Sequence, residues 1–174
     1  RSQFHLVQPP KIHFIEHHLC HAASAFFVSP FAEAAILTID GRGESACTMF
    51  SRGHGNKIEK ISEVKVPHSL GHLYAAITDY LGFKPFFDEW KVMGMSAYGK
   101  DTYREIFEQM LHLLPNGEYR LNLKYFQFPT HGRGKWVSDF LLKCLGPQRQ
   151  KMDPYEQRHF DIAFGLQKVI EKTG

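Results

Sequence analysis

The chain has 174 residues, of which 43% are hydrophobic and 22% are charged. These proportions are typical of a globular domain of ordinary size and exclude a disordered or low-complexity chain. The formal net charge of +3 is spread along the sequence without the basic stripe of a nucleic-acid-binding protein, and no apolar stretch approaches the roughly 20 residues that span a membrane. We therefore expect neither a nucleic-acid partner nor a membrane partner.

The cysteines bear on the cellular compartment. Cys20, Cys47 and Cys144 are odd in number and include no CxxC pair. This pattern argues against a disulfide framework and predicts a reducing, cytoplasmic location. The opening residues contain neither an apolar signal segment nor an initiator Met, so we expect a piece of a longer protein.

The first predicted elements are a strand over Lys11–Ile15, rich in β-branched and aromatic residues, and a helix over His17–Phe27. Apolar residues recur in the helix at intervals of three and four until Pro30 ends it. This helix places His17 and His21 on one face.

A meander of three strands is predicted next, over Ala34–Asp40, Ser45–Ser51 and Ile58–Val64. The first is a continuous apolar run, which is typical of a strand buried on both faces. A helix should then begin near Ser69 and end at Gly82.

The remaining elements are mostly helical. Residues 83–100 combine Gly, Pro and aromatic residues without a period, which is typical of a functional loop with about one helical turn. We expect a helix from Asp101 to about Leu114, a hairpin over Tyr119–Phe126 and a long helix from Asp153. Together these elements predict an α/β fold.

His17 and His21 form the first candidate metal-binding pair. Residues four apart on a helix have side chains about 5–6 Å apart, so two imidazoles can bind one cation. The spacing is only moderately specific, because 11 histidines produce chance pairs such as His68 and His72. The alternative is two partly exposed helical histidines.

Asp40 supplies a third candidate ligand at the end of the most apolar strand. A carboxylate there needs a partner or a metal to offset its desolvation, although an Asp that simply begins a β-turn is the alternative. With two imidazoles it makes a ligand set that suits Fe²⁺, Zn²⁺ or Mn²⁺ and leaves positions open for a substrate.

Two glycine-containing segments are candidate nucleotide or substrate sites. Gly41 and Gly43, beside Glu44, would let backbone N–H groups approach a phosphate, although an ordinary hairpin explains the same residues. Lys91 precedes a flexible segment that includes Gly94 and could reach an anionic substrate, although Lys is usually a solvated surface charge.

Two other catalytic interpretations are disfavoured. Cys20 adjoins the histidines, but adjacency in sequence is not the geometry of a Cys-His nucleophile, and a buried helical thiol is favoured. A metalloprotease is excluded because the sequence has no HExxH motif.

Three blocks resemble the NodU-type carbamoyltransferases: EHHLCHAASAFFVSPFAEAAILTIDGRGE, SLGHLYAAITDYLGF and EWKVMGMSAYG. The resemblance extends from about Ile12 to the end of the chain, and three ordered blocks are far more specific than one HxxxH motif. It implies part of an actin-like ATPase fold, with a mixed sheet and flanking helices.

The resemblance also implies metal- and ATP-dependent O-carbamoyl transfer. Family members use ATP and carbamoyl phosphate to form a carbamoyl adenylate on a separate C-terminal domain, and transfer the carbamoyl group to a hydroxyl of a sugar-containing acceptor. The family metal, often iron, is held by residues that match His17, His21 and Asp40 here.

Parts of the family pattern are absent from the 174 residues: the opening strands, the second lobe, a further Asp ligand and the adenylate-forming domain. We therefore expect residues 1–174 to be an incomplete N-terminal half of the catalytic domain, inert when isolated. The alternative is a metal- or nucleotide-binding regulatory module of the same superfold without transferase activity.

Overall fold

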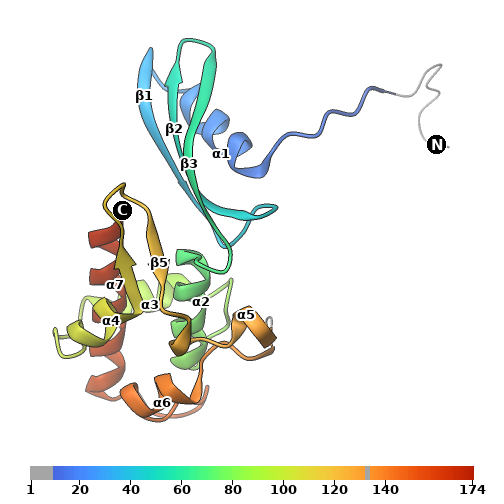
Figure 1. The fold of residues 1–174 in the computed structure, drawn as a ribbon. Coiled ribbons are helices and arrows are strands. Elements are labelled where there is room, and N and C mark those ends of the chain that lie inside the picture. Colours follow the sequence, from blue (N-terminus) through green and yellow to red (C-terminus); the bar gives the residue numbers. More distant parts are fainter. Residues whose placement is uncertain (1–9, 132–133) are drawn as a thin grey trace.

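The computed structural model describes residues 10–131 and 134–174, which form an α/β fold (Figure 1). The strands are β1 Glu33–Ile39, β2 Ala46–His54, β3 Lys57–Lys65, β4 Leu111–Leu113 and β5 Tyr119–Leu121. The helices are α1 His17–Phe26, α2 Leu70–Tyr80, α3 Glu89–Ser96, α4 Arg104–Met110, the 3₁₀ helix η1 Leu123–Tyr125, α5 Phe128–His131, α6 Asp139–Leu145 and α7 Gln157–Thr173. The predicted α/β class is confirmed, and the strand pairings among the described residues are antiparallel.

Strands β1, β2 and β3 form an antiparallel meander, as the sequence predicts, and α1 packs against it (Figure 1). The contact depends on Gly53 in β2, because a Cβ atom there would lie 2.7 Å from the ring of Phe26 in α1. A strand glycine commonly marks such a close approach. The packing therefore brings α1 directly onto the sheet.

Two expectations for the N-terminal part are wrong. In the described sheet β1 pairs with β2 alone, and Leu37 and Ile39 are 43% and 44% exposed, so β1 is not buried on both faces. Lys11–Ile15 forms no strand; the segment leads away from α1 (Figure 1), and Phe14 is 96% exposed. Composition favours a strand, but a strand also needs a neighbour for its backbone hydrogen bonds.

The helices from α2 onward gather below the sheet in Figure 1 and contain most of the main core. The Ser69 hydroxyl caps α2 by accepting the His72 N–H at 3.0 Å. Leu73, Ile77 and Tyr80 are fully buried at helical spacing. None of the described helices has the length and apolar character needed to cross a membrane.

Helix boundaries differ from the prediction in three places. α7 begins at Gln157, because Asp153 accepts a backbone N–H at 2.8 Å within a separate turn. α4 begins at Arg104, with Tyr103 and not Asp101 at the N-cap position. It ends at Met110 because residues 111–113 pair with β5. Residues 83–100, expected to be irregular with about one helical turn, contain the eight-residue helix α3.

We predict that Gly99→Ala destabilises the protein by about 1–3 kcal/mol or more. A Cβ atom there would lie 2.1 Å from the carbonyl oxygen of Phe160 in α7. Gly94→Ala is the matched control: it lies in α3 with no atom within 4 Å of its Cβ position, and Ala favours a helix by about 0.5–1 kcal/mol over Gly. Urea denaturation measures the free energy of unfolding of both variants, and equal changes would contradict the close contact between the turn at Gly99 and α7.

Candidate metal centre

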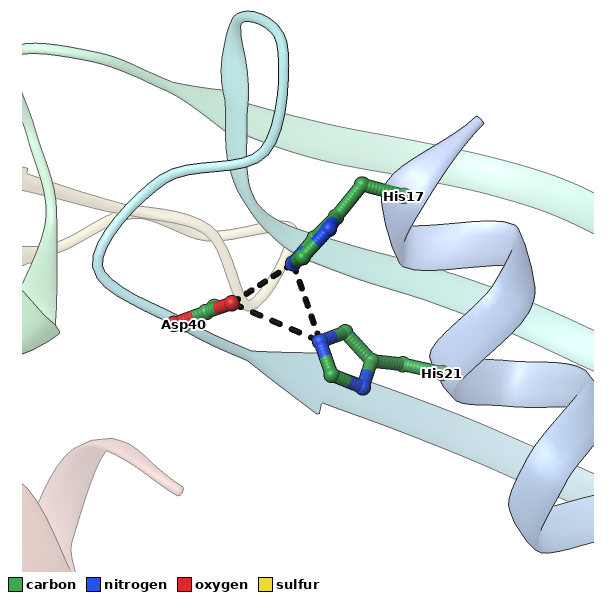
Figure 2. Close-up of side chains that lie close together, drawn as sticks. All are labelled: His17, His21 and Asp40. Carbon is green, nitrogen blue, oxygen red and sulfur yellow. Dashed lines mark hydrogen bonds and ion pairs between the residues drawn. The ribbon is translucent and has the colours of Figure 1, made fainter. Parts of the chain in front are cut away.

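His17, His21 and Asp40 converge where α1 meets the end of β1 (Figure 2). His17 Nε2 lies 2.7 Å from Asp40 Oδ2 and 3.0 Å from His21 Nε2, and His21 Nε2 lies 3.4 Å from Asp40 Oδ2. Within the described residues this is the one group of three or more His, Cys, Asp or Glu side chains whose ligand atoms all lie within 4.8 Å. The spacing thus predicts the position of the three side chains correctly, and metal binding stays a prediction.

The second HxxxH pair, His68 and His72, has the spacing without the geometry. α2 begins at Leu70, so His68 precedes the helix, and its Nδ1 accepts the Leu121 N–H at 3.2 Å. Spacing alone therefore does not define a ligand pair; both residues must lie on the helix.

His18 fixes the rotation of α1 against the sheet. Its ring is fully buried, with Nδ1 2.8 Å from Thr38 Oγ1 in β1 and Nε2 donating to the Ala46 carbonyl in β2 at 3.2 Å. A carbonyl oxygen only accepts, so Nε2 carries the hydrogen in that bond. Because α1 is tied to two strands at once, His17 and His21 face the end of β1.

The turn that follows β1 is held from two sides. Ser69, at the start of α2, donates its hydroxyl to the Gly41 carbonyl at 2.7 Å, and a Cβ atom on Gly71 would lie 2.7 Å from Gly41 Cα. On the other side, a Cβ atom on Gly43 would lie 3.1 Å from His17 Cβ. Gly43 and Gly71 therefore let the turn fit closely between α1 and α2.

The Asp40 carboxylate is held in its ionised form. Burial raises its pKa, but hydrogen bonds from His17, the Gly41 N–H at 2.6 Å and His21 outweigh that effect, so the pKa lies below its ordinary value. An ionised carboxylate beside two imidazoles is a set of ligands that can bind a cation.

The donor atoms fit a divalent transition metal. Three ligands about 2.1 Å from a tetrahedral ion stand about 3.4 Å from one another. The shortest observed separation, 2.7 Å between His17 Nε2 and Asp40 Oδ2, would therefore open by about 0.7 Å. The three side chains are 41%, 52% and 39% exposed, so a substrate could reach an ion held there.

A cavity of about 840 Å³ opens beside Asp40. Its wall consists of Ile39, Asp40, Gly41, Arg42, Gly43, Gly71, His72, Tyr74, Phe86, Glu89, Phe128 and Trp136. The candidate residues Gly41 and Gly43 thus lie in the wall. Glu44 does not: its carboxylate accepts the His17 N–H at 3.3 Å and satisfies the start of α1, whose N-cap residue makes no side-chain cap.

Lys91 and Gly94 lie outside the cavity wall. The Lys91 ammonium pairs with Asp88 at 2.7 Å, one turn earlier in the chain, and Gly94 is exposed on α3. The segment that contains them does border the cavity, through Phe86 and Glu89. Its place before a flexible Gly-containing segment suggested Lys91, whereas the fold places an aromatic ring and a carboxylate at the cavity wall.

The sequence interpretation missed two sets of residues. One is His18, which directly follows His17, because the sequence does not indicate which of two adjacent histidines is buried. The aromatic part of the wall includes Phe86, Phe128 and Trp136, which come from separate segments. No local pattern could have brought those rings together, because only the tertiary fold does so.

Comparison with known proteins identifies the class. The chain belongs to the carbamoyltransferase N-terminus family, whose sequence model matches residues 3–173. The chain is 44% identical over 94% of its length to the uncharacterized protein sll1178 of Synechocystis sp.. It is 38% identical over 95% to the nodulation protein NolNO of Sinorhizobium fredii, and 35% over 91% to the nodulation protein NolO of Bradyrhizobium diazoefficiens. It covers 27%, 23% and 27% of these three relatives, about a quarter of each.

We predict that His21→Ala weakens binding of Zn²⁺ or Fe²⁺ by more than about 100-fold. Loss of an outer partner of a metal ligand already costs about 10–100-fold, and His21 would be a direct ligand. His112→Ala is the control, because His112 is an exposed histidine at β4, outside the group. Calorimetric titration measures both, anaerobically for Fe²⁺, and equal affinities for the two variants would rule out the assigned ligands.

Proposed function

We propose that this chain supplies the metal-binding part of the site of an O-carbamoyltransferase. The observation that carries the proposal is the convergence of His17, His21 and Asp40 beside an open cavity, in a chain of the carbamoyltransferase N-terminus family. In the complete protein we expect the chain to be part of an actin-like, two-lobed catalytic domain.

Each protein group has a separate task in this proposal. His17, His21 and Asp40 would hold Fe²⁺, with Zn²⁺ or Mn²⁺ as alternatives. The ion would polarise the carbamoyl carbonyl and neutralise phosphate charge. Gly41 and Gly43, held between α1 and α2, place backbone at the cavity wall, where a substrate could lie close to it. Their own N–H groups are engaged within the protein, Gly41 with the Asp40 carboxylate at 2.6 Å and Gly43 with the Ala46 carbonyl at 2.8 Å, so these two N–H groups do not form the phosphate contact that the sequence suggested.

The proposed reaction begins elsewhere in the whole protein, where ATP, carbamoyl phosphate and water give a carbamoyl adenylate with release of pyrophosphate and phosphate. A hydroxyl oxygen of a sugar-containing acceptor then attacks the carbamoyl carbon. A new C–O bond forms, the bond from that carbon to the phosphate oxygen of the adenylate breaks, and AMP leaves with the electron pair. The hydroxyl proton is released, so the product is an O-carbamoylated sugar.

The location of the cavity supports the proposed role of the ion. Asp40 belongs both to the group of ligands and to the cavity wall, so a substrate in the cavity lies beside any bound ion. Proximity of this kind is a main source of rate acceleration, because it removes the entropic cost of bringing reactants together.

We predict that the isolated chain yields no carbamoylated product from ATP, carbamoyl phosphate and an amino sugar, because the adenylate-forming step needs other parts of the protein. The full-length protein should yield product, and its Asp40→Asn variant should lose it. Mass spectrometry detects the added carbamoyl group. Multiple turnover by the isolated chain would contradict the division of labour, and a full-length protein that binds metal without turnover would favour the regulatory module.

A further inference from the structure

The backbone of Phe86 has an unusual conformation. Its φ is 68°, in the left-handed region that bulky residues rarely adopt and that persists only where the surroundings hold it. The Phe86 N–H donates to the Glu89 carboxylate at 2.6 Å. Around it, Asp88 closes a turn by donating its N–H to the Lys84 carbonyl at 3.0 Å and accepting the Lys84 N–H on its carboxylate at 3.1 Å.

This conformation places the Phe86 ring in the cavity wall beside the candidate metal centre. The ring remains 43% exposed and lies 5.4 Å from the Trp136 ring and 6.3 Å from the His72 ring, at steep angles of 62° and 80°. A Cβ atom built on Gly41 would lie 3.8 Å from the edge of the Phe86 ring. The ring is thus close to the turn that begins at Asp40.

The chemistry of this wall suits a sugar ring. Aromatic faces pack against the apolar face of a ring, and a few polar groups then fix its orientation. Glu89 lies in the same wall, and its carboxylate accepts hydrogen bonds from hydroxyl or ammonium groups while repelling a phosphate. Backbone strain is often retained at ligand-binding positions, where the surrounding structure holds it.

We propose that Phe86 is the platform of an acceptor subsite, on which a pyranose ring packs with Glu89 bound to its hydroxyl or amino groups. The proposal rests on the proposed function for the identity of the ring as the carbamoyl acceptor. Phe86 and Glu89 then determine specificity: they hold the sugar hydroxyl beside the ion site and take no part in the chemistry.

Two tryptophans make a direct test possible, because the chain contains only Trp90 and Trp136. Trp136 lines the cavity, whereas Trp90 is 64% exposed and lies outside the wall. In the Trp90→Phe variant, tryptophan fluorescence therefore reports on the cavity alone. We expect glucosamine and methyl glucoside to cause a saturable change in this variant and none in Trp136→Phe, which reports from Trp90.

In the Trp90→Phe background, Phe86→Ala should weaken the binding of both sugars by about fivefold or more, and Phe86→Tyr should restore it. Phe87→Ala is the matched control, since the Phe87 ring packs under Lys84 outside the cavity wall. Phe86→Gly should also lose sugar binding but melt at a higher temperature than Phe86→Ala, because glycine accepts positive φ without strain.

Several results would overturn the proposal: sugar binding that is unchanged in Phe86→Ala, the absence of any saturable change with either sugar, or a Phe86-dependent change with AMP alone, which would assign the platform to a nucleobase. A Phe86→Gly variant that melts no higher than Phe86→Ala would contradict the strained backbone. The assay contains no metal and no carbamoyl donor. Its failure is therefore distinguishable from a failure of the proposed carbamoyl transfer.

Discussion

The buried ring of His18 is the contact on which the candidate site depends. Its two hydrogen bonds, to Thr38 in β1 and to the Ala46 carbonyl in β2, fix how α1 is rotated and how far along the sheet it lies. Loss of either bond would leave a buried polar group without its partner, which costs more than a hydrogen bond contributes on average. The convergence of His17 and His21 on Asp40 follows from this buried contact, since neighbouring positions on a helix turn together.

Close backbone packing completes the arrangement. The turn after β1 lies between α1 and α2, and glycines at positions 43 and 71 allow the approach. The same turn forms part of the cavity wall, so the ion site and the cavity share one structural element. A displacement of α2 would therefore move both at once. The strained turn at Phe86 adds an aromatic ring to the same cavity wall, and the hydrogen bond from the Phe86 N–H to Glu89 helps to hold its conformation.

Sequence reasoning reached the local features of this arrangement. Helical periodicity placed His17 and His21 together, and the apolar run before Asp40 located the strand end, because each signal depends only on neighbouring residues. It failed where the outcome depends on distant partners. Lys11–Ile15 has the composition of a strand but no strand beside it, and the burial of β1 depends on what covers its second face. Residues 111–113, predicted as the end of a helix, pair with β5 in a hairpin instead. The aromatic wall was beyond reach for the same reason, since its rings come from separate segments.

The central claim is that His17, His21 and Asp40 bind one divalent metal ion. The most direct measurement is anomalous diffraction from crystals grown with Fe²⁺ or Zn²⁺, with data collected on both sides of the absorption edge of the metal. The account predicts one strong anomalous peak about 2.0–2.2 Å from His17 Nε2, His21 Nε2 and Asp40 Oδ2. A peak at His68 and His72, or metal-saturated crystals with no peak at the junction of α1 and β1, would contradict it.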